Sequence, residues 1–176
     1  MKPGLFLTAA ATLLASATGA QAQEVFGGVA AHDVMTGITV SGIEDGVDLQ
    51  IGYRGARFGG SANQWTPAPY IFASVNSVGD TNFAAAGVSW KFGNQVYFRP
   101  GIGLAIHDGP SIVAPGDDRI DFGSRILFEP EVAVGVQLNE QVSAEASWVH
   151  LSHAKLFGPQ NPGMDSIGVR VNYRFR

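Results

Sequence analysis

Three side chains in the last part of the chain have the types and the spacing that ester hydrolysis requires. His150 and Ser152 are two residues apart, and Asp165 follows after a turn rich in Gly, Pro and Asn. If residues 141–152 form a strand, His150 and Ser152 project from the same face, about 6.6 Å apart along the backbone. A hairpin with the next strand would bring Asp165 back beside them.

A hydroxyl, an imidazole and a carboxylate together form a nucleophilic site. The hydroxyl is a poor nucleophile until the imidazole removes its proton, and the carboxylate fixes the imidazole tautomer and stabilises the imidazolium. The same spacing has a simpler interpretation, in which His150 and Ser152 are polar residues at a membrane interface and Asp165 belongs to a turn. On spacing alone, the simpler interpretation is the stronger one.

Alternation of apolar and polar residues dominates the chain beyond its first 22 residues, and no stretch has a convincing helical period. Eight strands are expected, at about residues 24–32, 46–57, 69–77, 82–92, 95–106, 122–137, 141–152 and 165–175. One face of each clear strand is apolar, and the other carries charges of both signs. In the seventh strand the apolar face consists of Val142, Ala144, Ala146 and Trp148.

Alternation does not say which face is inside the barrel that such strands would form. A soluble ligand barrel has an apolar interior and a wet exterior, and an outer-membrane barrel has the reverse arrangement. Mixed charge on the polar face, aromatic residues near the ends of the apolar faces, and short connections that tend to alternate with long ones favour the membrane arrangement. We therefore expect an all-β fold, an eight-stranded antiparallel transmembrane β-barrel.

Two segments fit this pattern less well. The connection at residues 59–68 is longer than the short periplasmic turns of outer-membrane barrels. In the third strand Tyr70 and Phe72 fall opposite Ile71, so the facing of this strand is ambiguous. Because an eight-stranded barrel leaves little lumen for transport, function is expected on the loops or the outer wall.

The beginning of the chain has the pattern of a cleavable secretory signal. Lys2 precedes an apolar stretch at residues 5–17, and the small-residue sequence Ala20-Gln21-Ala22 follows. We expect a signal peptide at residues 1–22 and a barrel domain at residues 23–176. The apolar stretch is shorter than the roughly 20 residues of a spanning helix. Cysteine is absent, so an exported chain must be held by a regular hydrogen-bonded fold without disulfides.

Parity and topology place the three polar side chains together. His150 and Ser152 continue the apolar face of the seventh strand, and Asp165 continues that of the eighth. Because the last strand must end in the periplasm, its start and the end of the preceding strand lie at the outer rim. The three groups are therefore expected to cluster on the lipid-facing side at the outer-leaflet interface. Polar groups that face lipid are costly unless they have partners or lie near the interface, and catalysis would give a reason for them.

Two short motifs span these strands and the loop between them: His150-Leu151-Ser152-His153-Ala154 and Asn161-Pro162-Gly163-Met164-Asp165. They resemble the patterns His-x-Ser-Asn-Ala and Asn-x-Gly-x-Glu of the lipid A 3-O-deacylase family, outer-membrane barrels that remove an ester-linked acyl chain from lipopolysaccharide. The resemblance implies His150 as base, Ser152 as nucleophile and Asp165 as orienting acid. It also implies Asn161 and the main chain of His153 as the groups that stabilise the oxyanion. The chain departs from the patterns by an Asp in place of Glu, by His153 in place of Asn, and by a slightly longer loop.

Lipopolysaccharide and outer-membrane lipids are the partners that the resemblance implies. The net charge is −4 and no basic run occurs, which argues against a nucleic-acid partner. No cofactor is expected, because His32, His107 and His153 lack metal-ligand spacing. The interior is expected to hold a charge network of Glu129, Glu131, Glu145, Arg170 and Arg174. Two other functions stay open: a non-catalytic outer-membrane barrel for adhesion or membrane integrity, and a soluble secreted ligand barrel.

Overall fold

The computed structural model describes residues 23–39, 42–110, 118–157 and 161–175. Its elements are β1 (Gln23–Ala31), β2 (Val47–Arg54), the short 3₁₀ helix η1 (Phe58–Gly60), β3 (Ala68–Asn76), β4 (Phe83–Ser89), β5 (Phe92–Gly93), β6 (Val96–His107), β7 (Ile126–Gln137), β8 (Val142–Leu151) and β9 (Met164–Phe175). No helix in these ranges is long and apolar enough to cross a membrane. Residues 1–22, where the sequence predicts a signal peptide, lie outside the described residues.

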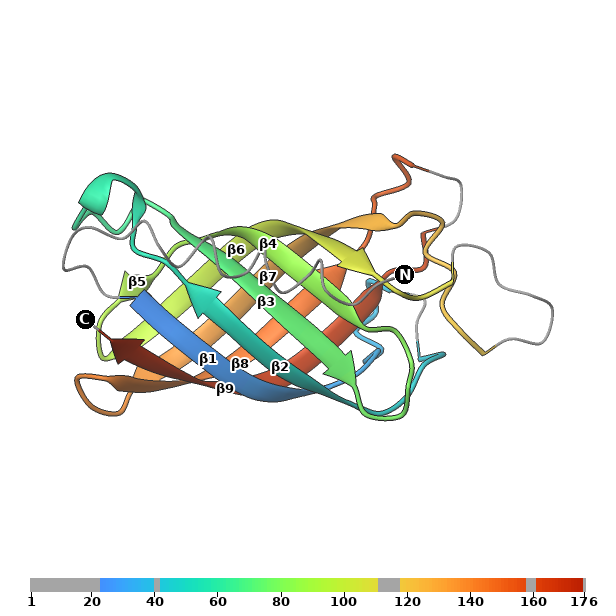
Figure 1. The fold of residues 1–176 in the computed structure, drawn as a ribbon, viewed down its shortest axis with the longest axis horizontal. Coiled ribbons are helices and arrows are strands. Elements are labelled where there is room, and N and C mark those ends of the chain that lie inside the picture. Colours follow the sequence, from blue (N-terminus) through green and yellow to red (C-terminus); the bar gives the residue numbers. More distant parts are fainter. Residues whose placement is uncertain (1–22, 40–41, 111–117, 158–160, 176) are drawn as a thin grey trace, which may run out of the picture.

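All strand pairs are antiparallel, and the sheet closes on itself because β1 pairs with β9 and β4 pairs with β6. The two-residue strand β5 pairs only with the start of β6, so the barrel wall consists of eight strands. Figure 1 shows the tilted strands, with the end of β9 beside the start of β1. The predicted eight-stranded antiparallel barrel is confirmed. Differences from the expected strand bounds are confined to a few residues at strand ends.

The connections divide the barrel into two ends. Both ends of the described barrel chain, Gln23 and Phe175, lie at one end and pair with each other. The turns that follow β2, β4 and β7 lie at the same end, which we call the periplasmic end. The loops after β1, β3, β6 and β8 gather at the opposite, outer end (Figure 1). The long periplasmic segment after β2 is ordered by η1 and by a hydrogen bond from the N–H of Phe58 to the carbonyl of Pro67, 3.0 Å.

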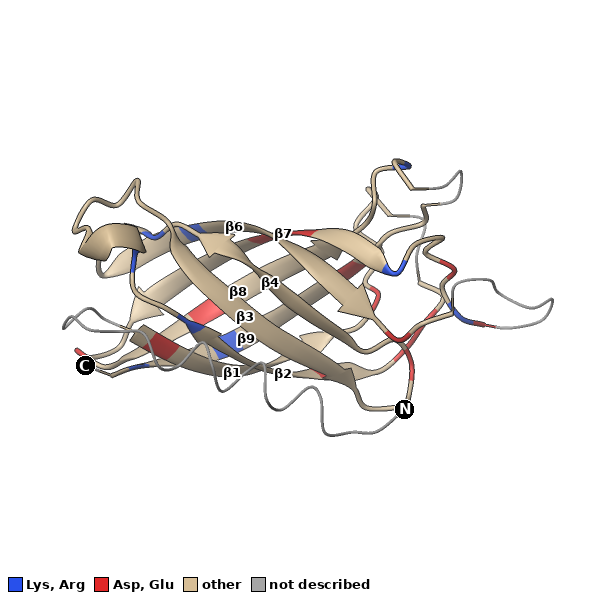
Figure 2. Ribbon diagram, turned by 45° about the horizontal axis from the view of Figure 1, so that its top comes forward, with Lys and Arg blue, Asp and Glu red and all other residues tan. Residues whose placement is uncertain are grey.

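Burial alternates along the strands and decides which face meets lipid. Ile51 is 71% exposed, whereas its neighbour Gln50 is 5% exposed. Every Lys, Arg, Asp and Glu in the strands is buried except Arg174 at the periplasmic end. Figure 2 marks the positions of these charged residues along the ribbon. In β3 Tyr70 and Phe72 point inside, which resolves the ambiguity of that strand. An apolar exterior around a polar interior is the arrangement of a transmembrane barrel.

The predicted charge network lies in the barrel interior, together with a hydrophobic cluster that includes Phe26, Phe72 and Leu127. Arg170 pairs with Glu131 at 2.7 Å, and Glu145 accepts hydrogen bonds from Arg99 and Arg54 at 2.7 and 3.4 Å. The other members are linked to the same network: Tyr70 donates a hydrogen bond to Glu129, and Arg174 pairs with Glu24. Pairing of this kind is what allows charges to be buried.

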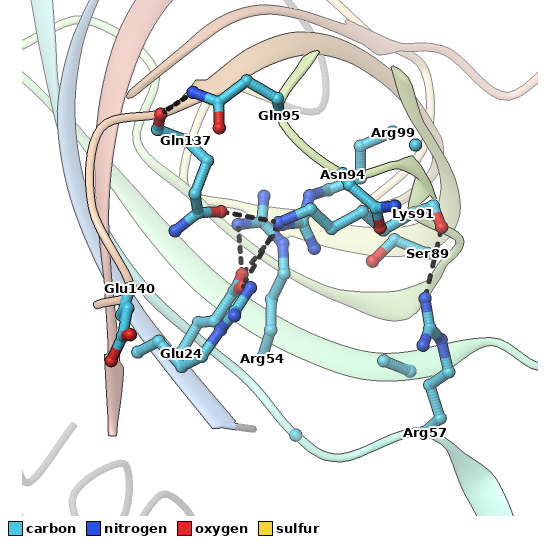
Figure 3. A pocket seen from close by; sticks show the side chains of 14 residues that line it. Glu24, Arg54, Arg57, Ser89, Lys91, Asn94, Gln95, Arg99, Gln137 and Glu140 are labelled. Carbon is cyan, nitrogen blue, oxygen red and sulfur yellow. Dashed lines mark hydrogen bonds and ion pairs between the residues drawn. The ribbon is translucent and has the colours of Figure 1, made fainter. Parts of the chain in front are cut away.

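A polar pocket of about 410 Å³ opens at the periplasmic end, next to this network. Lys91, Arg54 and Arg99 lie around Glu24 (Figure 3). Their side-chain nitrogen atoms are 4.0, 4.0 and 2.8 Å from the carboxylate oxygens of Glu24. The pocket is bounded by the periplasmic turns and lies at the opposite end of the barrel from His150. The hollow of the barrel therefore does not contain the candidate catalytic side chains.

Candidate active site

The hairpin of β8 and β9 brings together two of the three predicted catalytic side chains. In its register His150 lies opposite Asp165, and Leu151 lies opposite Met164. Nδ1 of His150 is 2.7 Å from Oδ1 of Asp165. Because an ionised carboxylate only accepts hydrogen bonds, Nδ1 carries the proton, and Nε2 of the neutral ring is left as a proton acceptor.

Both residues lie on the parity that the sequence predicts. His150 follows Trp148 on the lipid-facing side of β8, and the two rings stack with centroids 5.9 Å apart. Asp165 precedes Ile167 on the same side of β9. Asp165 is part of a strand, so its simpler interpretation as a turn residue is wrong.

The turn into β9 is shaped by Gly163. Its φ of +71° lies in the left-handed region that favours glycine. A Cβ atom there would lie 3.2 Å from Cε1 of His150 and 3.0 Å from Cγ2 of Thr39. Glycine therefore allows the backbone to approach the imidazole closely and leaves room for a residue from a distant loop.

Ser152 lies one residue beyond β8, with its backbone fixed against β7. Its N–H donates to the carbonyl of Phe128 at 3.1 Å, and its carbonyl accepts from the N–H of Phe128 at 2.7 Å. The side chain is half-buried. Among the described residues the hydroxyl makes no hydrogen bond with His150, so the Ser–His contact of the expected triad is not formed here.

The two residues that the resemblance links to the oxyanion contact each other. The N–H of His153 donates to Oδ1 of Asn161 at 2.8 Å. The N–H of His153 is therefore already used in a hydrogen bond, and the Nδ2 amide group of Asn161 is the donor of the pair that is left. The His153 ring is buried and packs beside Phe157, with centroids 5.9 Å apart, so its imidazole anchors the loop.

Asp165 is 0% exposed although it lies on the lipid-facing side, because the loop after β1 covers it. This first outer loop, described at residues 32–39 and 42–46, makes three hydrogen bonds to Asp165. The N–H of Val34 donates to its carbonyl at 2.7 Å, Thr39 donates to Oδ2 at 3.2 Å, and Thr36 donates to the same oxygen. The carboxylate is thus satisfied on both oxygens.

Sequence reasoning missed Thr36 and Thr39. They are 129 and 126 residues from Asp165, so spacing gives no indication of the contact. The closed topology contains the only usable signal: because β1 pairs with β9, the segment that leaves β1 must emerge beside the start of β9.

The first outer loop is anchored by buried charges. Nδ1 and Nε2 of His32 lie 2.8 and 3.0 Å from carboxylate oxygens of Asp48 and Glu44. Burial alone would lower the pKa of His32, but these hydrogen bonds outweigh it and raise the pKa to about 9. Burial would likewise raise the pKa of Glu44, but hydrogen bonds from His32 and from Ile120 and Thr81 lower the pKa to about 2. Oδ2 of Asp33 closes the loop by accepting three backbone N–H bonds.

Within the part of the chain that the structure describes, no group of three or more His, Cys, Asp or Glu side chains has the arrangement of a metal site.

The fold and the site define a transmembrane barrel of eight strands with a His–Asp pair and a serine on its outer wall. The chain belongs to the lipid A 3-O-deacylase (PagL) family, whose sequence profile matches residues 44–174. No curated protein sequence matches it. Among solved structures it is similar to the outer membrane enzyme PagL, with 18% identity, a TM-score of 0.62, and coverage of 85% of this chain and 98% of the other.

Two further solved structures share the fold. The outer membrane protein Ail of Yersinia pestis has 13% identity and a TM-score of 0.51, covering 88% of this chain and 99% of Ail. Neisserial surface protein A has 14% identity and a TM-score of 0.52, covering 87% of this chain and 97% of the other. At these identities the structural similarity shows only a shared barrel fold. Membership of the family rests on the match to the sequence profile.

Proposed function

We propose that this chain is an outer-membrane lipid A deacylase that hydrolyses the ester of the acyl chain at the 3-O position. Family membership supports the substrate class. The observation that carries the proposal is the His150–Asp165 pair, joined at 2.7 Å on the lipid-facing wall at the outer end, next to Ser152. A membrane lipid reaches such a site directly, because its acyl chains lie along the barrel wall and its ester groups lie at the interface.

Catalysis begins with attack by the Ser152 hydroxyl on the ester carbonyl. Nε2 of His150 takes the hydroxyl proton, and Asp165 accepts the Nδ1–H bond and stabilises the imidazolium. The tetrahedral intermediate places negative charge on the former carbonyl oxygen. The Nδ2 amide of Asn161 is the donor that we assign to this charge, in the way that oxyanion donors act.

Collapse of the intermediate breaks the bond to the sugar oxygen, which takes the proton from His150. The acyl group remains on Ser152 as an ester. Water then attacks this ester with His150 again acting as base, which releases the fatty acid and restores the hydroxyl.

Exposed apolar side chains flank the site on two loops. Met35 and Ile38 lie on the first outer loop, and Leu156 and Phe157 lie on the loop after β8. They suit contact with acyl chains in the outer leaflet. The proposal also includes export through a signal peptide at residues 1–22 and residence in the outer membrane, in agreement with the apolar exterior of the barrel.

Mass spectrometry of lipid A tests the proposal. Purified protein in detergent is incubated with lipopolysaccharide, and loss of one acyl chain from the 3-O position is measured over time. Ser152→Ala should lose activity by several orders of magnitude, as triad knockouts do, with the barrel intact. Ser124→Ala, two residues before the start of β7 at the same outer end, is the matched control and should remain active. A non-catalytic barrel for adhesion or membrane integrity would release no acyl chain even as wild type.

A further inference from the structure

The acid of the proposed triad is held from a part of the chain outside the β8–β9 hairpin. Oδ1 of Asp165 accepts from His150, and Oδ2 accepts from the hydroxyls of Thr36 and Thr39. Both threonines lie in the first outer loop, outside residues 44–174 that the family profile matches.

We propose that Thr36 and Thr39 are positioning residues of the catalytic acid: their hydroxyls hold the Asp165 carboxylate in the orientation that keeps the proton of His150 on Nδ1. The inference rests on the proposed function of the site. It adds two residues from the first outer loop to a set otherwise drawn from β8, β9 and the loop between them.

The surroundings of Asp165 show why its second oxygen needs partners. Without them Oδ2 of a fully buried carboxylate would lack these hydrogen bonds, which is costly for a buried polar atom. The carboxylate also sits on a short side chain, and rotation about its side-chain bonds would turn the oxygens away from the imidazole. Two donors on Oδ2 disfavour that rotation and leave Oδ1 directed at Nδ1.

The first outer loop has the order that a positioning element requires. His32 and Asp33 anchor it through a buried ion-pair cluster and three backbone N–H bonds. The 2.7 Å bond from the N–H of Val34 to the Asp165 carbonyl ties the loop to the start of β9. These contacts direct the hydroxyls of Thr36 and Thr39 at the acid.

The test replaces each hydroxyl by a methyl group of similar size, in Thr36→Val, Thr39→Val and the double variant. Nitrogen NMR of histidine-labelled protein in detergent micelles reports the tautomer of His150 without reference to activity. We expect the Nδ1–H tautomer in the wild type and a mixture in the double variant. We also expect kcat to fall by about 10- to 100-fold, the usual effect of a partner that orients a catalytic group, with KM little changed. The single variants should have kcat values between those of the wild type and the double variant.

Serine variants and a distant threonine provide the controls. Thr36→Ser and Thr39→Ser keep the hydroxyl and should restore the tautomer and the rate. Thr66→Val alters a threonine at the periplasmic end, which hydrogen-bonds Ser61 at 3.1 Å, and should change neither. Folding of every variant is checked by heat-modifiable gel mobility.

Three results would overturn the inference. The first is a double valine variant that keeps the wild-type tautomer of His150 and the wild-type pH–rate profile, while an Asp165→Asn variant measured in the same way changes the tautomer and the profile. The second is a serine variant as impaired as the valine variant, which would assign the effect to packing of the methyl group. The third is an activity loss that appears only in unfolded protein. Absence of acyl release by the wild type would instead refute the proposed function, and the tautomer measurement would still decide the role of the threonines.

Discussion

Replacement of Asp165 by Asn keeps the shape of the side chain and removes its charge. The native carboxylate accepts three hydrogen bonds: one from His150, and one each from Thr36 and Thr39. An amide has a single acceptor oxygen. If that oxygen faces His150, the tautomer is kept but the imidazolium loses its counter-charge. If the NH₂ group faces His150 instead, the ring proton moves to Nε2, which then cannot accept the proton of Ser152.

Both orientations of the amide lower the rate, so the loss should approach that of the corresponding change in a well-studied triad. There the cost is about 10⁴-fold, or about 5.5 kcal/mol of activation free energy. The barrel itself should fold normally, because the threonine hydroxyls rotate to accept from the NH₂ group. The variant is thus expected to be folded and nearly inactive.

Asp165→Glu provides the comparison, because it keeps the charge and adds one methylene. Asp165 is fully buried, so the longer side chain must displace the first outer loop or the imidazole. Overpacking of this kind costs about 1–3 kcal/mol, which corresponds to a loss of roughly 10- to 100-fold if all of it falls on the catalytic geometry. The expected order of activity is therefore wild type, then Glu, then Asn.

The assay is the initial rate of fatty-acid release from lipopolysaccharide, with lipid A identified by mass spectrometry and folding checked by heat-modifiable gel mobility. An Asn variant as active as the wild type, beside a weakened Glu variant, would remove Asp165 from the reaction. It would leave the residue only as an anchor for the first outer loop.

Two further predictions concern the surroundings of the site. The pKa of His32 is raised, so the stabilisation that this residue gives to the first outer loop is complete below about pH 6.5 and is lost as the pH rises through about 9. Limited proteolysis should therefore cut the first outer loop faster above about pH 9. The variant His32→Gln should lose this pH dependence. Protection that persists unchanged to pH 10.5 or so would contradict it. Gly163→Ala combines a φ of +71° with a Cβ 3.2 Å from Cε1 of His150, so it should lower acyl release while the barrel stays folded. Gly59→Ala, also at positive φ but in open space at the periplasmic end, is its control, and equal activity of the two variants would refute the reasoning.

The strands and their facing were predictable because lipid enforces a simple rule. Along β8, Val142, Ala144, Ala146 and Trp148 face outward and Ser143, Glu145 and Ser147 face inward, so parity places His150 and Ser152 on the lipid-facing wall. The same rule failed to decide β3, where the buried Tyr70 and Phe72 are themselves apolar. Aromatic rings inside the barrel pack against one another and against Arg170, and alternation does not record such packing.

The contacts of the outer loops were not predictable from the sequence. Register fixes the position of Asp165 opposite His150, but the irregular first outer loop follows no period. Its fold depends on buried charges, such as His32 between Glu44 and Asp48, which the β1–β2 hairpin brings together. Likewise, the hydrogen bond from His153 to Asn161 depends on the path of the loop after β8, and residue spacing does not determine it.

The acid of the proposed site is more deeply buried than the histidine and the serine, and this difference follows from the place of the site on the outer wall. Asp165 is 0% exposed under the first outer loop, the His150 side chain is 15% exposed beside Trp148, and Ser152 is half-buried at the rim. A charge that faces lipid needs cover, whereas the proposed nucleophile needs access to the lipid. A single hairpin does not supply both, because its two strands present the three side chains to the same face. The cover must therefore come from another segment, and the loop after β1 is the nearest one, since β1 is the neighbour of β9 on the side away from β8.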